Sequence, residues 1–216
     1  PELEFRPCTL RDGIYGGVYG RIAACMLGKP LEVNWKRSDI ERYLKAGGTF
    51  PLDDYISCVP GTGLARASIP SCREYISCAQ ADDDTTYFAI GLRLVEDFGR
   101  DFTTQDVARF WLGNLPYGET WGPEHTRYLL LGLGLLWHEA PFPQGEEWDR
   151  LTSFLNDGEE LIGAMIRGDA FGLMNPGRPG KAAELAWRDG MLTHRKTGLY
   201  AEMWVAATLA AAFYTR

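Results

Sequence analysis

Three consecutive carboxylates, Asp82-Asp83-Asp84, are the residues best suited to carry chemistry, and the Thr85 hydroxyl follows them directly. Within a continuous helix, neighbouring side chains point about 100° apart. At a helix start they can converge, because the first residue is still non-helical. Hard oxygen donors packed this closely suit Mg²⁺ or Ca²⁺. The alternative is helix capping, in which each acid near the N-terminus contributes about 0.3–1 kcal/mol, and the residue types alone leave both interpretations open.

The elements that position this cluster are predicted to be helices joined by Gly/Pro loops. Apolar residues recur at helical spacing, and no segment alternates as a strand does. The expected helices span residues 11–27, 38–46, 83–98, 105–112, 123–137, 158–166, 180–192 and 199–214. Residues 49–81 are expected to form a long irregular loop, a kind of segment that is often functional. The chain is therefore predicted to be all-α.

Composition and charge exclude several classes of protein. The 216 residues carry a net charge of −7 and no cluster of Lys and Arg, so neither nucleic acid nor an anionic membrane is an expected partner. The longest apolar stretch, residues 203–214, is too short to span a bilayer, which needs about 20 residues. The five cysteines form no CxxC pair, which predicts reduced thiols and a cytoplasmic protein.

Four stretches, taken in order, resemble the ADP-ribosylglycohydrolase family, which includes the dinitrogenase-reductase-activating glycohydrolases. They are a helix with small residues at 16, 20, 24 and 28 that runs into Glu32, the run 82–85, the segment 162–167, and the segment 186–202. These are similar to the family's glycine-rich first helix, its [S/T]-D-D-T metal motif, its N-G-A-x-M-R loop and its segment with S/T-H. The order and spacing agree over essentially the whole chain.

The resemblance implies an orthogonal multi-helix bundle formed by residues 1–216 as a single domain. It also implies two Mg²⁺ ions that hold the ribose hydroxyls of ADP-ribose, and hydrolysis of the glycosidic bond from ribose C1″ to an acceptor. The expected partners are therefore an ADP-ribosylated protein or a small ribosyl compound. Asp82, Asp83 and Asp84 would be ligands of the first metal cluster. Asp83 and Asp84 would share the catalytic role with Glu32, which would act on the attacking water.

Substrate contacts are expected at five further positions. By resemblance, Gly163 would let the backbone approach the diphosphate, and His194 would approach the phosphate or the ribose. On the residues alone, His194 can equally complement the dipole of the preceding helix. Asp169 and Asn175 follow the equivalent of the diphosphate loop and are candidates for ligand contact. Trp121 lies in a predicted loop, where an aromatic ring can stack on a base.

Three departures from the family pattern lead to a second hypothesis. Cys25 replaces the Asp of the family's first motif, Ile162 replaces the Asn before Gly163, and no second D-x-D-T motif follows. The helix at residues 199–214 is apolar nearly all round and therefore has to be buried. We expect either an N-terminal portion of a longer protein, or a dimer or second chain that covers this helix. The alternative function is a catalytically inactive family member that binds a ligand or a partner.

Overall fold

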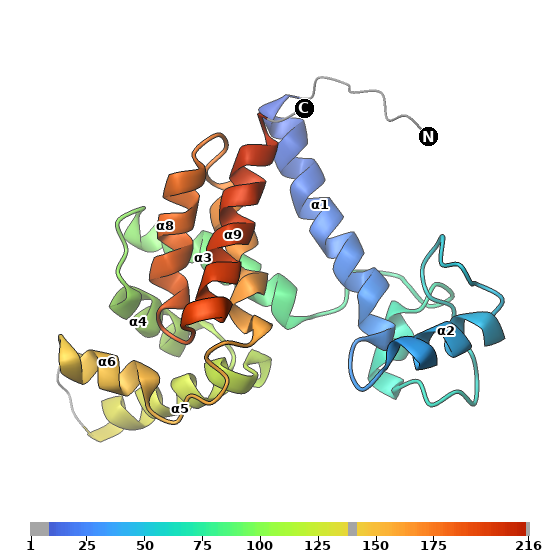
Figure 1. Ribbon diagram of the computed structural model, residues 1–216, viewed down its shortest axis with the longest axis horizontal. Helices are drawn as coiled ribbons and strands as arrows, with labels where there is room; N and C mark the ends of the chain where they lie inside the picture. The colour runs from blue at the N-terminus through green and yellow to red at the C-terminus, as the bar shows by residue number, and fades with distance from the viewer. Residues whose placement is uncertain (1–8, 138–141, 215–216) are drawn as a thin grey trace. The chain divides into compact units, whose positions relative to one another are not determined.

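The computed structural model describes residues 9–137 and 142–214, and within these ranges it consists of helices without a strand (Figure 1). The α-helices are α1 (Leu10–Gly28), α2 (Arg37–Ala46), α3 (Asp83–Phe98), α4 (Thr104–Asn114), α5 (Gly122–Trp137), α6 (Glu146–Ser153), α7 (Gly168–Leu173), α8 (Pro179–Gly190) and α9 (Lys196–Ala212). Short 3-10 helices join them, namely η1 (Lys29–Leu31), η2 (Arg66–Ser71), η3 (Tyr117–Glu119) and η4 (Ile162–Arg167). The predicted all-α class is confirmed.

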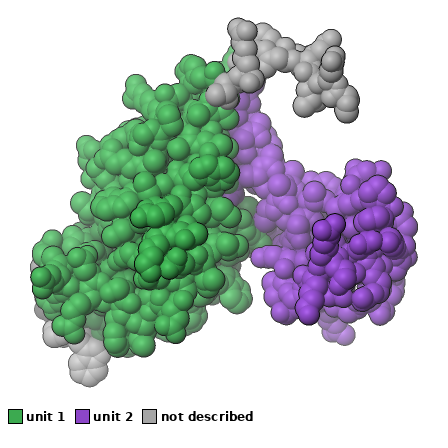
Figure 2. Space-filling view, viewed as in Figure 1, with its two compact units in different colours: residues 1–10, 82–216 green, residues 11–81 purple. Residues whose placement is uncertain are grey.

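The chain divides into two compact units (Figure 2). Unit 1 comprises residues 1–10 and 82–216, and unit 2 comprises residues 11–81. The acidic run and the five predicted substrate contacts belong to unit 1, whereas Glu32 belongs to unit 2. The expectation of one domain over residues 1–216 stays a prediction.

Unit 2 has a small apolar core beside α2. Leu31, Tyr43, Leu44 and Ile56 are buried together in it. The Trp35 ring meets the Tyr43 ring edge-on, with 5.3 Å between the ring centroids, a geometry that aromatic pairs prefer. Apart from η2, residues 49–81 contain no regular helix, as the sequence predicts.

Unit 1 has the larger core, to which α3, α4, α7, α8 and α9 contribute. Its most deeply buried apolar side chains include Leu94, Trp111, Phe171, Leu185 and Ala206. α8 and α9 lie side by side (Figure 1). α7 approaches α9 closely because its interface carries glycine: a Cβ atom at Gly172 would lie 2.7 Å from the Leu209 Cβ.

Side-chain caps fix the starts of α3 and α4. Asp82 is the N-cap of α3, whose bounds agree with the predicted helix over residues 83–98. At α4, the Thr103 hydroxyl accepts the Asp106 N–H at 3.2 Å, and Asp106 Oδ2 accepts the Thr103 N–H at 2.9 Å. This reciprocal capping box satisfies backbone donors that the first turn leaves unpaired.

The predicted helix over residues 158–166 is wrong in its bounds. Residues 157–160 form turns, and the helical segment is η4, which continues into α7. The Glu159 carbonyl accepts the Arg195 N–H at 2.8 Å, so it pairs with the segment that precedes α9 rather than with a local helical turn. The sequence pattern also misses α6, because only Trp148 and Leu151 are apolar among its eight residues.

One face of α9 is buried, and another is exposed. The buried residues of this helix are Gly198, Leu199, Glu202, Ala206 and Ala210. In contrast, Tyr200 and Trp204 are 64% and 66% exposed. A second copy or another chain that covers these rings stays a prediction.

No disulfide joins the described cysteines, which are Cys25, Cys58, Cys72 and Cys78, and Cys8 lies outside the described residues. No described helix combines the length and the apolar character that a bilayer span requires.

Candidate functional site

The acidic run lies where an extended segment becomes α3. Asp82 has extended backbone angles (φ −159°, ψ 147°), and its Oδ1 accepts the Asp84 N–H at 3.1 Å. The Thr85 hydroxyl donates to the Asp82 carbonyl at 2.9 Å. One carboxylate oxygen of Asp82 lies within 4.8 Å of one carboxylate oxygen of Asp84. The non-helical first residue therefore brings Asp82 and Asp84 together, and metal binding by all three aspartates stays a prediction.

Capping and metal binding are compatible at this position. A carboxylate has two oxygens and about four lone-pair sites, so a bond from Asp82 to a backbone N–H leaves the group able to act as a ligand. Asp83 and Asp84 occupy the first turn of α3, where the helix dipole stabilises negative charge. Two adjacent hard oxygen donors at a helix start fit Mg²⁺ or Ca²⁺ chemically.

A second group of charges, which the sequence analysis did not single out, is buried in unit 1. We call it the Arg167 cluster; it consists of Arg167, Glu124, Asp189 and Glu202. Arg167 Nη1 donates to Glu124 Oε1 at 2.7 Å, and Nε donates to Asp189 Oδ2 at 2.5 Å. Glu202 Oε2 lies 3.7 Å from Arg167 Nη2. One guanidinium therefore faces three carboxylates, and each of the four side chains is at most 4% exposed.

Two aromatic rings complete the surroundings of the guanidinium. The carbon at its centre lies 5.6 Å from the Tyr87 ring centroid and 5.1 Å from the Trp111 ring centroid. Burial acts to lower the pKa of Arg167, but the charges of Asp189, Glu202 and Glu124 outweigh it and raise that pKa overall. The cation is therefore held in its charged form by its partners, as a buried arginine requires.

The three carboxylates of the Arg167 cluster do not share the positive charge equally. Arg167 donates hydrogen bonds to Glu124 and Asp189, whereas Glu202 Oε2 lies 3.7 Å from Arg167 Nη2, beyond hydrogen-bond distance. Burial first, and then the charge of Asp189, raise the pKa of Glu202 well above its ordinary value. Burial also raises the pKa of Glu124, and the charge of Arg167 opposes that shift. Burial therefore favours the protonated form of Glu202.

Gly163 lies in η4 with its α-carbon facing Glu124. A Cβ atom built at Gly163 would lie 2.6 Å from Glu124 Oε1 and 2.8 Å from Oε2. Any side chain at this position would displace the carboxylate, since real Cβ contacts are longer. The structure thus gives a reason for glycine here that is separate from the expected approach of a diphosphate. That substrate contact stays a prediction.

His194 is fully buried between the Arg167 cluster and the start of α9. Its Nδ1 lies 2.8 Å from the Thr193 hydroxyl and 3.6 Å from Glu124 Oε1. Burial, followed by the charges of Arg167 and Arg195, lowers the pKa of His194 to about 3. The imidazole is therefore neutral at physiological pH. Its predicted contact with the phosphate or the ribose is not tested by these distances.

Asp169 and Asn175 occupy the two ends of α7. Asp169 is half-buried in the first turn. Asn175 is 1% exposed; its Nδ2 donates to the Phe171 carbonyl at 2.8 Å, and its Oδ1 accepts from Arg100 Nη1. This amide closes the C-terminal end of α7. Ligand contact at both positions stays a prediction.

Trp121 precedes α5, and its side chain is 67% exposed. Its carbonyl accepts the Glu124 N–H at 3.1 Å, which starts α5 and places Glu124 in the first turn. Stacking of this ring on a base stays a prediction.

Glu32 ends η1 in unit 2 and is exposed. The structure therefore leaves the catalytic assignment of Glu32, like those of Asp83 and Asp84, as a prediction.

The residues of the Arg167 cluster had a detectable signal in the sequence. Glu202 interrupts the apolar run of α9, and Arg167 and Asp189 lie inside two of the stretches that carry the family resemblance. A charged residue on an apolar helix face is buried only when it is paired. What the sequence does not contain is the pairing, since Glu124 is 43 residues away from Arg167.

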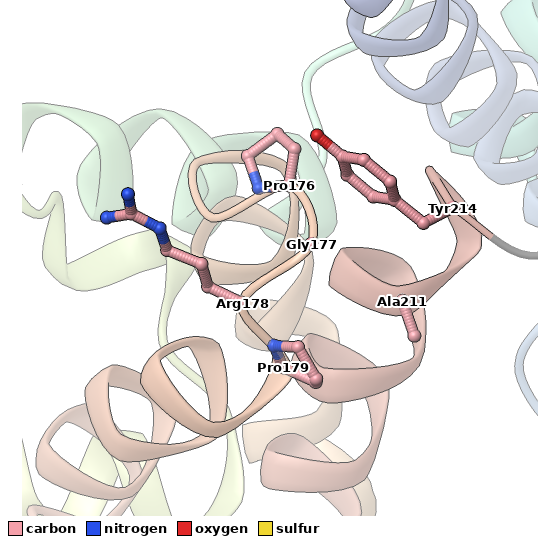
Figure 3. A pocket seen from close by; sticks show the side chains of 6 residues that line it. All are labelled: Pro176, Gly177, Arg178, Pro179, Ala211 and Tyr214. Carbon is pink, nitrogen blue, oxygen red and sulfur yellow. The ribbon is translucent and has the colours of Figure 1, made fainter.

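A surface pocket at the C-terminal end of α9 contains none of the predicted site residues. It is lined by Pro176, Gly177, Arg178, Pro179, Ala211 and Tyr214 (Figure 3). The Tyr214 ring lies against Gly177, which has a φ of +71°. The Arg178 guanidinium points away from the Tyr214 ring (Figure 3). The pocket therefore brings no pair of catalytic groups together.

A sequence model of the ADP-ribosylglycohydrolase family matches residues 6–216. The chain therefore belongs to this family, and its all-α architecture is of the family's type. No curated protein and no solved structure matches the chain. Proteins of this family are hydrolases that act on ADP-ribosylated substrates and generally depend on metal ions.

Proposed function

We propose that the protein is a Mg²⁺-dependent glycoside hydrolase that removes an ADP-ribosyl or related ribosyl group from an N- or O-linked acceptor. The observation that carries this proposal is the convergence of Asp82 and Asp84 at the start of α3, within 4.8 Å of each other. Carboxylate oxygens in this arrangement match the preference of Mg²⁺. Membership of a generally metal-dependent family supports the same assignment.

The proposed roles follow from the chemistry of the side chains. Asp82, Asp83 and Asp84 hold the metal, which when bound orients the vicinal ribose hydroxyls and supplies positive charge. Glu32 accepts a proton from the attacking water, whose oxygen forms a bond to C1″. The bond from C1″ to the acceptor nitrogen or oxygen breaks, the acceptor takes a proton from the solvent, and Glu32 returns to the solvent the proton that it accepted. The products are the ribosyl compound with a hydroxyl group at C1″ and the free acceptor.

The substrate side of the proposal rests on Gly163, His194, Asp169, Asn175 and Trp121. Support is strongest for Trp121, because its ring is exposed. It is weakest for Asn175, whose side-chain oxygen and nitrogen both bond within the protein. The acceptor is an ADP-ribosylated protein or a small ribosyl compound, and by family resemblance the active site takes two Mg²⁺ ions. We further propose that the protein acts in the cytoplasm.

A second function is favoured by one observation at η4. Ile162 is 69% exposed where the family has a polar Asn, so this loop presents an apolar side chain beside Gly163. On this second proposal, the protein binds a ligand or a partner and does not turn it over. The two functions make the same prediction for binding and opposite predictions for product release.

The experiment is titration calorimetry of Mg²⁺ with and without ADP-ribose, together with chromatography of ADP-ribose released from arginine-linked and serine-linked model substrates. The variants are Asp82→Asn with Asp84→Asn, and the matched control is Asp97→Asn, an exposed carboxylate at the other end of α3 that pairs with Arg93 at 3.1 Å. Loss of Mg²⁺ binding and of release only in the double variant supports the hydrolase. Coupled binding without release supports the binding function, and full release by a folded double variant contradicts the metal site.

A further inference from the structure

The side-chain space of Gly163 is occupied by one group, the carboxylate of Glu124. The three heavy atoms nearest to a Cβ atom built at Gly163 are Oε1, Oε2 and Cδ of Glu124, at 2.6, 2.8 and 3.0 Å. Glu124 comes from the first turn of α5, which is 39 residues earlier in the chain. The carboxylate is therefore pressed against the backbone near the start of η4.

The same carboxylate holds the other end of η4. Arg167 is the last residue of η4, and its Nη1 donates to Glu124 Oε1 at 2.7 Å. Arg167 is itself fixed by the 2.5 Å bond from Nε to Asp189 Oδ2 and by a 3.0 Å bond from Nη2 to the Thr193 hydroxyl. Glu124 thus contacts η4 near its start, at Gly163, and at its last residue, Arg167. Within this six-residue segment, Ala164 and Arg167 are buried.

The charge of Glu124 matters as much as its shape. An isolated buried carboxylate beside a backbone that accepts an anionic ligand would repel that ligand. The charge-assisted bond to Arg167 compensates the negative charge while it holds the carboxylate in place. The pair therefore holds η4 while Arg167 offsets part of the negative charge that Glu124 places beside Gly163.

We propose that Glu124 is a positioning residue of the hydrolase, which fixes the η4 backbone at Gly163 in the place where the ligand's diphosphate binds. This inference rests on the proposed function, because it takes the diphosphate contact at Gly163 from that proposal. Glu124 acts through the backbone of η4 and through Arg167, and it does not touch the substrate. A displacement of this segment weakens ligand binding, because hydrogen bonds from its backbone to the diphosphate depend steeply on distance and angle.

Two variants disturb the contact from opposite sides. Glu124→Gln keeps the shape of the side chain and removes its charge, and Gly163→Ala keeps both charges and adds a methyl group 2.6 Å from Glu124 Oε1. The matched control is Glu147→Gln, an exposed residue of α6. For each variant, thermal unfolding establishes folding, calorimetry gives the dissociation constant of ADP-ribose with Mg²⁺, and kinetics give kcat and KM on the model substrate that the wild-type chain cleaves.

We expect both variants to raise the dissociation constant and KM at least about tenfold and to change kcat less than about threefold. A merely structural role would lower the melting temperature and leave the dissociation constant of the folded protein unchanged.

The outcomes separate this inference from the proposed function. Unchanged affinity in folded Glu124→Gln and Gly163→Ala overturns the positioning role alone. Absence of ADP-ribose binding by the wild-type chain overturns the proposed function and this inference with it. If Glu124→Gln does not fold, Gly163→Ala decides, because it leaves the buried ion pair chemically intact.

Discussion

Glu124 Oε1 accepts a 2.7 Å hydrogen bond from Arg167 Nη1, and both side chains are at most 4% exposed. Around this pair, Asp189 and Glu202 add two further buried carboxylates, so the single cation cannot neutralise all three acids. The desolvation of charge in such a cluster is costly, and it raises the pKa of both Glu202 and Glu124. The pH dependence of stability follows from this arrangement.

Glu202→Gln is expected to remove a loss of stability at rising pH. Because the pKa of Glu202 is raised in the folded state, the folded protein keeps a proton that the unfolded chain releases above pH about 4.3. The free energy of unfolding of the wild type therefore falls as pH rises through this window, by up to about 1.4 kcal/mol per pH unit. Gln mimics the neutral acid, so the variant lacks this slope. Urea denaturation between about pH 5 and about pH 8 measures the difference, and parallel curves for the two proteins would sink the prediction.

His194→Asn is expected to remove a loss of stability that occurs as pH decreases. The pKa of His194 is lowered to about 3 in the folded state, so the unfolded chain binds a proton below pH about 6.5 that the folded protein does not. The stability of the wild type therefore falls as pH decreases from about 6.5, and the variant loses this contribution. Thermal unfolding at several pH values between about 5 and 7 tests it. His125→Asn, at a half-buried histidine, is the control, and an equal change in slope in that variant would count against the assignment.

Substitutions at Asp82 are expected to separate capping from charge. Asn is as good an N-cap as Asp, so Asp82→Asn keeps the bond to the Asp84 N–H, whereas Asp82→Ala loses it and costs about 1 kcal/mol of stability. Both variants lose the negative charge, and both are expected to lose Mg²⁺ binding. Chemical denaturation of the two variants measures the stability lost with the N-cap, and calorimetry separately measures their Mg²⁺ binding. Wild-type Mg²⁺ affinity in folded Asp82→Asn would show that this residue is a cap and not a ligand.

Trp121→Ala is expected to leave stability within about 0.5 kcal/mol of the wild type, because the ring is 67% exposed. If the ring stacks on a base, removal is expected to weaken ADP-ribose binding by about 1–3 kcal/mol, and Trp121→Phe is expected to retain part of it. Tyr200→Ala, an exposed aromatic on α9, is the matched control. Equal affinities for all four proteins would remove Trp121 from the substrate site.

The sequence alone determined the class of the fold and the start of α3. Apolar spacing predicts helices throughout, and the acidic run before residues 83–98 predicts a capped helix start, because both signals depend on neighbours within one or two turns. The family resemblance also rests on local motifs in order, and the family match over residues 6–216 confirms it.

Tertiary contacts decided which segments became helices where the local sequence pattern was misleading. The turns at residues 157–160 replace a predicted helix because the Glu159 carbonyl pairs with Arg195, and α6 forms from a segment with only two apolar residues. The Arg167 cluster joins residues from η4, α5, α8 and α9, so its pairing is invisible in any local window. A buried charge is stable only beside partners that folding brings from distant parts of the chain. For that reason the sequence contained the carboxylates, and the tertiary structure determined which of them bond Arg167 and which one fills the side-chain space of Gly163.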